Sequence, residues 1–438
     1  MTEPRGLLIE GAAQVATLAG GLRRGASQGD ACVLDRAGPF SVAVKDGYVL
    51  AVGPRDVVAA RLADEGLGAR DFRVVDASGC LVTPGLIDAH THLVFAGTRE
   101  AEWQMRLNGA SYLDVLDAGG GILSTVAATR AASVEGLAAS GRARLAEMLA
   151  CGTTTAEVKS GYGLSAESEL RILAAIGLLA KEGPVQLVAT YLGAHAVPME
   201  FRVHGASATD EYVLSVISEQ LPAVAEQGIA RFCDVFCEAG VFSAPQTAAI
   251  LEAARELGLQ LRIHADELAS SGGAELAAAM GCLSADHLAE PSAEGLEALA
   301  TAAATDHPVV ATLLPATSWF MGKHHFAPAR RFIDAGVPVA LATDLNPGTS
   351  PTVSLPLVMS IACLEMGLSP AEALVAVTVN AAHSLGLGDS LGSIEPGMRA
   401  DLVVWDVPNI DQLAYWLGAR PARTVVKRGA IVFDRSKS

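Results

Sequence analysis

The sequence is short of positive charge. Its 438 residues contain 31 Lys and Arg against 48 Asp and Glu, which gives a formal net charge of −17. Such an excess of acid opposes sequence-independent binding to phosphate backbones or anionic membranes, so neither nucleic acid nor a membrane is an expected partner. An anionic small-molecule substrate would need a locally placed cation to offset this field.

Secretion signals, long hydrophobic runs and paired cysteines are also missing. No basic region leads into a hydrophobic run at the N-terminus, so no secretory signal is predicted. The longest uncharged stretch, residues 345–364, is interrupted by Pro347, Pro351 and Pro356 and is not typical of a membrane span. The seven cysteines are odd in number and irregularly spaced, as expected for reduced thiols in a cytoplasmic protein.

Glycine-rich phosphate loops are a further absence. Neither a GxGxxG nor a Walker pattern follows any candidate strand. The cluster AGGGIL at residues 118–123 lacks the lysine and the preceding strand that a phosphate site requires, so we expect a flexible loop there. These absences disfavour an open, doubly wound nucleotide-binding sheet.

Both ends of the chain are β-rich. Residues 41–53, SVAVKDGYVLAVG, alternate apolar and polar side chains around Asp46-Gly47, a pair suited to a type I′ hairpin turn. Residues 400–407 and 424–434 repeat the pattern, with Arg428-Gly429 at the second turn. Because no long linker is evident, residues 1–83 and 385–438 are predicted to combine into one small β-sandwich domain.

The central part, residues 84–384, alternates short apolar runs with Ala- and Leu-rich segments of helical periodicity, such as residues 133–150 and 210–227. With 51% hydrophobic residues, the chain can bury the core of one large α/β barrel. This many repeats of strand and helix are typical of a (β/α)8 barrel. The candidate strands are GLIDAHTHL, TTTAEVKSG, VQLVATYLGAH, RFCDVFCEAG, LQLRIHADE, LSADHL, PVVATLLPA and PVALATDLN.

Histidine and aspartate residues follow several of these strands, at the carboxyl edge where such barrels carry their reactive groups. His90 and His92 in DAHTH are two residues apart, so both imidazoles project from one face and can reach one metal ion, although two polar residues can also cap a strand end. His264 ends LQLRIH, His287 ends LSADH and Asp344 ends PVALATD. Each alone is compatible with a structural role, but the set indicates a site.

His90, His92, His264 and Asp344 offer three neutral nitrogen atoms and one carboxylate. This set suits zinc or iron and leaves a coordination position for water. A metal ion held in this way lowers the pKa of water towards neutrality, which supports hydrolysis. The pattern therefore predicts a catalytic centre that holds zinc or iron.

Longer motifs make the pattern more specific. Between residues 11 and 351 stand GAAQVATLAGG, DAHTHLVFAGTREAEWQMRLNGASYLDV, AGGGILSTVAATRAAS, EVKSGYGL, YLGAHAVP, HADEL and TDLNPGTSP. With these motifs the chain resembles the imidazolonepropionase family of histidine breakdown, within the amidohydrolase superfamily. The resemblance implies hydrolysis of the cyclic amide of 4-imidazolone-5-propanoate to N-formimidoyl-L-glutamate.

The resemblance also implies a role for individual residues. The metal ligands would be His90, His92, His264 and Asp344. The residues near the substrate would be Arg99, Tyr162, His195, Glu267 and Thr349, and those that touch the product Asn346 and Gly348.

The residue types fit the substrate-binding roles. A fixed guanidinium fork at Arg99 suits a propionate carboxylate and supplies the local cation, although Arg99 can equally form a surface salt bridge with Glu100 or Glu102. Tyr162 stands between two glycines, where it is free to lean over a pocket or to pack within the loop.

The catalytic roles are expected to fall on three residues. Glu267 follows His264 by three residues and, if the chain becomes helical there, faces the same pocket as a general base, with His287 orienting or relaying the proton. Its alternative is an acid at a helix N-terminus. Asp344 would pass a proton to the departing ring nitrogen, and His195 would polarise the imidazolone oxygen or pack in the core.

The fourth strand departs from many superfamily members, which bind two metal ions bridged by a carbamylated lysine there. RFCDVFCEAG has no lysine, so a single ion is expected, and Lys159 on the second strand is expected to pack or to pair with Glu157. We assign the remaining histidines to loops or helices: His204, His307, His324, His325 and His383.

Two other functions fit the same barrel. One is aminohydrolysis of a guanine- or cytosine-like ring, and the other is ligand binding without catalysis. Arg99 favours an acidic substrate over a neutral base, and retention of every ligand residue opposes a silent barrel. A homodimer is expected because most oligomers are symmetric and even-numbered.

Overall fold

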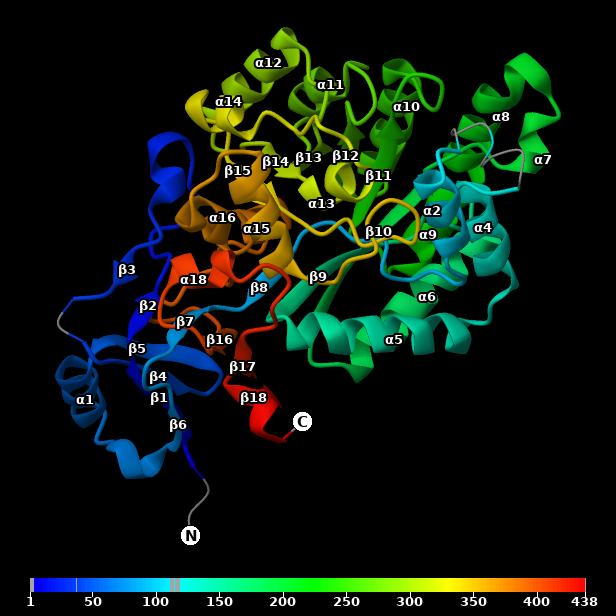
Figure 1. Cartoon of the computed structure of the whole chain (residues 1–438). Helices are drawn as coiled ribbons and strands as arrows, with labels where there is room; N and C mark the ends of the chain where they lie inside the picture. The colour runs from blue at the N-terminus through cyan, green and yellow to red at the C-terminus, as the bar shows by residue number, and fades with distance from the viewer. Residues whose placement is uncertain (1–3, 37, 111–113, 115–118, 438) are drawn as a thin grey trace.

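The computed structural model describes residues 4–36, 38–110, 114 and 119–437. Its largest sheet is a barrel of eight parallel strands that follow one another in chain order (Figure 1). They are β8 (Leu86–Asp88), β9 (Thr153–Lys159), β10 (Gln186–Ala194), β11 (Phe232–Cys237), β12 (Gln260–Ala265), β13 (Ser284–His287), β14 (Val310–Leu313) and β15 (Val339–Leu341). Each lies in one of the eight predicted runs, so the (β/α)8 prediction is confirmed.

The barrel is nearly closed by its first and last strands. Just beyond β8 and β15, the Asp344 amide donates to the His90 carbonyl at 3.0 Å, and the His92 amide donates to the Leu345 carbonyl at 2.9 Å. These bonds bring the carboxyl ends of the first and last strands together. Ligand-type residues that are about 250 positions apart in the chain are therefore neighbours in space.

Helices cover the outside of the barrel. Several begin at a serine whose hydroxyl accepts from the first turn, as Ser133 and Ser165 do for α5 and α6. The helices of the barrel region are α2 (Glu100–Leu107), α4 (Ile122–Ala131), α5 (Val134–Ala150), α6 (Ala166–Glu182), α7 (Met199–Arg202), α8 (Ala208–Ser215), α9 (Leu221–Gln227), α10 (Ala244–Glu256), α11 (Gly273–Met280), α12 (Ala293–Ala303), α13 (Pro315–Phe320), α14 (Ala329–Asp334), α15 (Leu355–Glu365), α16 (Pro370–Ala376) and α17 (Val379–Ser384).

The two helical segments expected from periodicity differ in regularity. Residues 133–150 form the single helix α5, whereas residues 210–227 are divided between α8 and α9 by a wider turn at Val216–Gln220. Pro222 at the start of α9 has no amide hydrogen for the preceding turn, which favours this interruption. The AGGGIL cluster leads into α4 through Gly119–Gly121, and its residue 118 lies outside the described residues.

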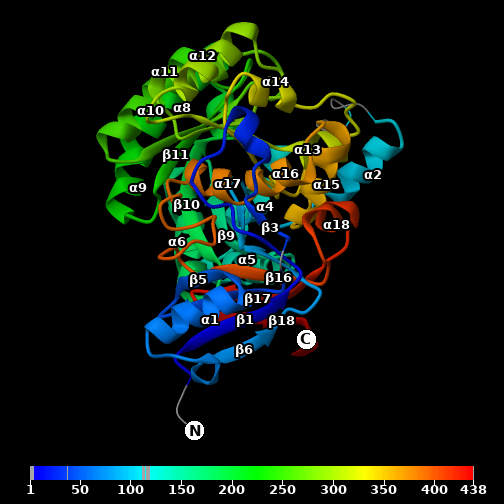
Figure 2. The same ribbon diagram turned by 90° about the vertical axis from the view of Figure 1, so that its left-hand side faces the viewer.

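Both chain ends form the small domain beneath the barrel (Figure 2). One sheet has the order β5-β4-β1-β6 and the other β18-β17-β16-β7-β2-β3. Side chains of both sheets, such as Ile9, Val42, Val404 and Val426, share one core, as predicted for a sandwich. The strands are β1 (Gly6–Ala12), β2 (Gln14–Ala16), β3 (Val33–Leu34), β4 (Phe40–Lys45), β5 (Tyr48–Pro54), β6 (Arg73–Asp76), β7 (Leu81–Pro84), β16 (Leu402–Trp405), β17 (Ala422–Lys427) and β18 (Ala430–Asp434), with helices α1 (Arg55–Asp64) and α18 (Ile410–Tyr415).

The two predicted hairpin turns are present. Asp46 and Gly47 have φ values of 54° and 83°, and Arg428 and Gly429 have values of 47° and 77°. Two consecutive left-handed residues are what a type I′ turn requires. We propose domain boundaries near residues 83/84 and 384/385, because β7 ends at Pro84 and α17 at Ser384.

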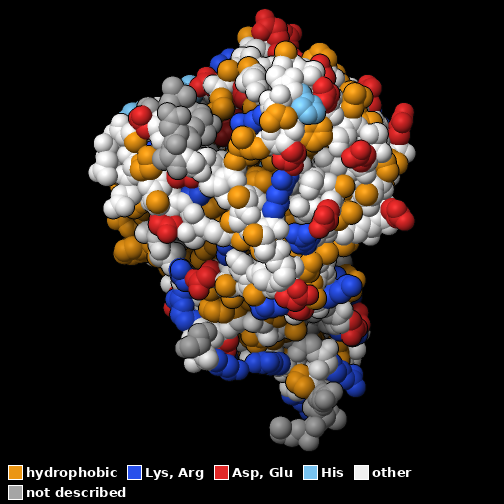
Figure 3. Space-filling model, turned by 90° about the vertical axis from the view of Figure 1, so that its right-hand side faces the viewer, with side chains coloured by type: hydrophobic (Ala, Val, Ile, Leu, Met, Phe, Trp, Pro, Cys, Tyr) orange, Lys and Arg blue, Asp and Glu red, His pale blue; other side chains and the backbone are white. Residues whose placement is uncertain are grey.

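The molecular surface is mixed in character. On the face in Figure 3, acidic and basic side chains are interspersed and hydrophobic side chains are scattered among them. Among the described residues, no helix combines the length and hydrophobicity needed to cross a membrane. All seven cysteines are free thiols.

The contact between barrel and small domain depends on a glycine. The buried Trp405 indole donates to the Thr83 hydroxyl at 2.8 Å, and its ring packs against Gly152, where a Cβ would lie 2.4 Å from the ring. Gly152 also has a φ of 92°, which disfavours other residues.

Replacing Gly152 by alanine is therefore expected to destabilise the protein through two separate effects. The left-handed backbone costs about 1–2 kcal/mol, and overpacking against Trp405 costs roughly 1–3 kcal/mol more. Gly79→Ala is the matched control, because Gly79 has a φ of 75° and no atom lies within 4 Å of the position that a Cβ would take there. Urea unfolding should show a larger loss of unfolding free energy for Gly152→Ala; equal losses would contradict the packing argument.

Candidate metal centre

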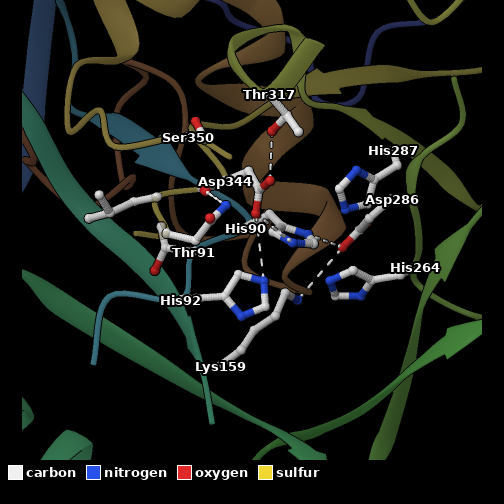
Figure 4. A network of polar contacts seen from close by, with 12 residues as sticks. His90, Thr91, His92, Lys159, His264, Asp286, His287, Thr317, Asp344 and Ser350 are labelled. Carbon is white, nitrogen blue, oxygen red and sulfur yellow. Dashed lines mark hydrogen bonds and ion pairs between the residues drawn. The ribbon is translucent and has the colours of Figure 1, made fainter. Parts of the chain in front are cut away.

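Five side chains converge at the carboxyl end of the barrel (Figure 4). His90 and His92 follow β8, His264 lies in β12, His287 ends β13 and Asp344 follows β15. The Asp344 carboxylate oxygen Oδ1 lies 3.5 Å from His90 Nε2 and 3.6 Å from His92 Nε2, and the His90 and His264 ring centroids are 4.5 Å apart. The structure thus brings together the ligand set expected from the sequence.

The free ring nitrogens of this cluster fit a cation. His90 Nε2 and His264 Nε2 are buried and have no hydrogen-bond partner, and His92 Nε2 lies 3.6 Å from Asp344 Oδ1. Burial lowers the pKa of His90 and of His92 well below the ordinary value, so both rings are neutral. Buried nitrogen lone pairs without a donor are costly unless a metal ion or water satisfies them.

Two carboxylates determine which nitrogen is free. Asp286 Oδ2 lies 2.7 Å from His90 Nδ1, and Asp234 Oδ1 lies 3.0 Å from His264 Nδ1. Each carboxylate accepts the Nδ1 hydrogen, which leaves the Nε2 lone pair available for a metal ion. The donor chemistry therefore fits zinc or iron, both of which bind neutral imidazole and carboxylate.

His287 and Glu267 lie beside the cluster. His287 offers a nitrogen within 4.8 Å of those of His90 and His264, so it is a fifth potential ligand. Its Nε2 lies 3.5 Å from Glu267 Oε2, and burial lowers the pKa of His287 to about 4. The pair predicted to transfer protons is thus adjacent to the ligands.

The loop that carries Glu267 is shaped by another carboxylate. Glu238 Oε2 accepts from the Glu267 and Leu268 amides at 3.0 and 2.9 Å. The helix α11 begins only at Gly273, so Glu267 does not belong to a helix N-terminus. A loop, rather than the expected helical turn, turns Glu267 towards the pocket.

Asp344 is held in an unusual backbone conformation. Its φ is 52°, and His287 has a φ of 74°, which costs energy for residues other than glycine. Asp344 Oδ2 accepts from the Thr317 hydroxyl at 2.6 Å, so Oδ1 faces the imidazoles. Burial, reinforced by the Glu267 charge, raises the pKa of Asp344 to about 7.

Arg99 forms a salt bridge with Glu102, one of its two expected alternative partners. It also lies against Gly348, one of the residues expected to touch the product. Its Nε and Nη2 donate to Glu102 Oε2 at 2.9 and 2.7 Å. A Cβ on Gly348 would lie 2.0 Å from Arg99 Nη1. The guanidinium therefore occupies space that only a glycine leaves open, with its Nη1 side turned away from Glu102.

His195 and Tyr162 line the site beside the ligands. The His195 ring stacks on His92 with centroids 4.9 Å apart, and the buried Tyr162 ring is 5.6 Å from His92. His195 Nδ1 donates to the Gly161 carbonyl at 3.0 Å, and burial lowers the pKa of His195 to about 3. The neutral ring then has a lone pair at Nε2, which can accept a hydrogen bond; the expected polarisation of the imidazolone oxygen would need a hydrogen on this nitrogen.

The amide of Asn346 shapes the loop after β15. Its Nδ2 donates to the Asp344 carbonyl at 2.7 Å and to Thr349 Oγ1 at 2.9 Å. Its Oδ1 accepts from the Gly348 and Thr349 amides at 2.9 and 2.8 Å. Asn346 thus holds Gly348 and Thr349 close to Asp344 through bonds that occupy its own side chain.

Sequence reasoning missed Asp234, Asp286 and Arg262, which are fully buried. They could have been recognised as charged residues inside otherwise apolar strands, because each of the three stands in a run suited to a barrel interior. It also overlooked the pattern GASQG at Gly25–Gly29, which matches GxSxG. That segment is a short 3-10 helix in which the Ser27 hydroxyl donates to the Arg24 carbonyl, so it is not the strand-to-helix turn of a serine nucleophile.

The other histidines have different surroundings. His204 pairs with Glu211 near α8, and His325 Nε2 lies 3.1 Å from the Ala289 carbonyl. His383 lies on α17 beside Gly388. Lys159 pairs with Glu157 at 2.8 Å, as expected.

Comparisons with known proteins agree with this geometry. The model of the amidohydrolase family matches residues 81–432. The imidazolonepropionase of Geobacillus kaustophilus is 50% identical over 433 residues, which cover 99% of both chains, and that of Brevibacillus brevis is 46% identical over 99% of this chain and 98% of the relative.

Solved structures share the fold at lower identity. An adenosine deaminase from Xanthomonas campestris with bound zinc is 20% identical with a TM-score of 0.67, covering 99% of this chain and 94% of that one. The guanine deaminase of E. coli is 17% identical with a TM-score of 0.68, covering 98% and 99%. From the match to the family model and the identity to these relatives, the chain belongs to the imidazolonepropionases of the amidohydrolase family.

Proposed function

We propose that the protein hydrolyses the cyclic amide of 4-imidazolone-5-propanoate to N-formimidoyl-L-glutamate, a step of histidine breakdown. The observation that carries this proposal is the convergence of His90, His92, His264 and Asp344 beside the Glu267–His287 pair, with the Nε2 atoms of His90 and His264 buried and without a hydrogen-bond partner. Membership of the family supports the same reaction. The alternative without catalysis leaves these buried nitrogens unexplained.

His90, His92, His264 and Asp344 would hold one zinc or iron ion. When bound, such an ion acts as a Lewis acid and lowers the pKa of water. Asp286 and Asp234 accept the Nδ1 hydrogens of His90 and His264, which would leave both Nε2 atoms available to hold such an ion.

Proton transfer falls to the residues next to this site. Water adds its oxygen to the ring carbonyl carbon, the ring C–N bond breaks, and the departing nitrogen gains a proton. Glu267 accepts the proton from water, and the neutral His287 beside it relays or orients that proton. Asp344, next to both histidine ligands, would pass a proton to the leaving nitrogen.

Substrate orientation falls to Arg99, His195, Tyr162 and the loop after β15. Arg99 is held by Glu102 along one side and binds the propionate carboxylate through the other. The His195 Nε2 lone pair accepts from a ring N–H, while the buried Tyr162 packs beside it. Gly348 and Thr349 bring the loop after β15 into contact with substrate and product, and Asn346 fixes that loop.

The reaction itself distinguishes this proposal from aminohydrolysis. Ring opening consumes the absorbance of freshly made imidazolone propionate without releasing ammonia, because both ring nitrogens remain in the product. Release of one ammonia per turnover would contradict the proposal, and so would a metal-loaded protein that leaves the absorbance unchanged.

We further propose a homodimer in the cytoplasm. Symmetric dimers are the commonest soluble oligomers, and seven unpaired thiols suit a reducing compartment. Sedimentation equilibrium measures the first property, and fractionation of the cells that produce the protein measures the second.

Metal binding should depend on the ligand histidines and not on buried histidines in general. We expect His264→Ala to fall from about one ion per chain to a small fraction after gel filtration, because a ligand is lost. His383→Ala is the control, since His383 Nε2 is also buried without a partner but lies outside the cluster. Elemental analysis that finds equal metal loss in both variants would refute the assignment.

The Arg99 contact predicts a specific effect at Gly348. Alanine there would displace the guanidinium, so we expect KM for the acid substrate to rise roughly 10- to 100-fold, as for Arg99→Ala, because a charge-assisted hydrogen bond is lost. Gly68→Ala is the control, since no atom lies within 4 Å of a Cβ there. An unchanged KM in Gly348→Ala would show that Arg99 does not bind the carboxylate from this position.

A further inference from the structure

Lys159 lies at the end of β9 with no exposed surface, inside the barrel and below the ligand cluster (Figure 4). Its Nζ is 2.8 Å from Glu157 Oε1, 2.7 Å from Asp234 Oδ2 and 3.7 Å from Asp286 Oδ2. A lysine that contacts three buried carboxylates is rare, because each charge must be compensated away from water.

Two of these carboxylates, those of Asp234 and Asp286, also contact the imidazole rings of candidate metal ligands. Asp234 receives Lys159 on Oδ2 and both the ring and the backbone amide of His264 on Oδ1, at 3.0 and 3.1 Å. Asp286 Oδ2 lies 2.7 Å from His90 Nδ1. One ammonium group therefore contacts the carboxylate partners of two ligands on different strands.

The third carboxylate holds the segment between two ligands. Glu157 Oε1 receives Lys159, and Oε2 accepts from the Thr91 amide at 3.2 Å. The Thr91 hydroxyl donates to the Glu157 carbonyl at 2.7 Å. Because Thr91 lies between His90 and His92, these hydrogen bonds to Glu157 fix the backbone of the HxH pair.

We propose that Lys159 is a positioning residue that orients the imidazole ligands as one unit and thereby sets the affinity of the centre for a divalent metal ion. The inference rests on the metal site of the proposed function. Lys159 touches neither the metal ion nor the substrate; it acts through Glu157, Asp234 and Asp286.

Charge and positioning predict opposite effects when Lys159 is removed. Taking a cation away from the neighbourhood of a metal site lowers electrostatic repulsion, so charge alone predicts tighter metal binding. Loss of the shared hydrogen-bond donor frees three carboxylates that orient the ligands, so positioning predicts weaker binding. The sign of the change therefore distinguishes the two.

The experiment compares zinc affinity of Lys159→Met and the wild-type chain by competition with a chromophoric chelator, starting from metal-free protein. We expect about 10- to 100-fold weaker binding, the usual effect of losing an outer partner of a metal ligand. The gain in Tm on adding zinc should shrink accordingly. Unchanged or tighter zinc binding would overturn the proposal.

Lys427→Met is the matched control. Lys427 is another buried lysine, and it donates to Asp401 and to the Thr154 carbonyl at 2.7 and 2.8 Å, at the contact with the small domain. Its loss should lower the Tm of the metal-free protein but leave zinc affinity unchanged. Equal weakening in both variants would mean that any buried lysine matters only for stability.

The double variant Glu157→Gln/Lys159→Met removes the pair while preserving net charge, so it remains testable if the single variant does not fold. We expect its zinc binding to stay weaker than that of the wild-type chain; wild-type affinity would show that Lys159 acts by charge alone. If the wild-type protein itself binds no zinc or iron, the proposed metal site fails, which is a different result from failure of the Lys159 role.

Discussion

Two hydrogen bonds from imidazole to carboxylate, His90 with Asp286 and His264 with Asp234, are the constraint on which the site depends. Without them, either nitrogen of each ring could carry the hydrogen, and the ring could turn. With them, the Nε2 lone pairs of both rings are fixed. Burying Asp286 and Asp234 is unfavourable by itself, because buried carboxylates are stable only when they are fully paired.

That pairing accounts for the charge inside the barrel. Lys159 and Arg262 supply two cations to Glu157, Asp234 and Asp286, and Arg262 lies 3.0 Å from Asp286. These side chains sum to one negative charge. Asp344, ionised when it holds a metal ion, would add a second, so one divalent cation would balance these six side chains. The acidic interior thus favours a metal ion in the same way as the unpaired nitrogens do.

The sequence was sufficient for the barrel and for the convergence of the candidate ligands, because both depend on patterns within single strands. Each apolar run contained one strand, and the histidines that end these runs meet since parallel strands share a carboxyl edge. Asp286 and Asp234 could not be assigned, because their partners are set by which strands are adjacent and how those strands are registered. The hydrogen bond that orients the His195 ring could not be predicted for a related reason: the carbonyl that accepts it belongs to Gly161, on another loop.

The loop after β15 connects metal binding to substrate recognition. Asp344 begins it in a left-handed conformation, Asn346 closes it through four hydrogen bonds, and Gly348 lies against Arg99. Only a few residues therefore separate the carboxylate that faces the imidazoles from the glycine that faces the guanidinium. Under the proposed function, this hydrogen-bonded loop would set the spacing between the metal ligands and the guanidinium that binds the carboxylate tail, and the substrate would have to match that spacing. This short segment would then select substrates by the length of the tail as well as by its charge.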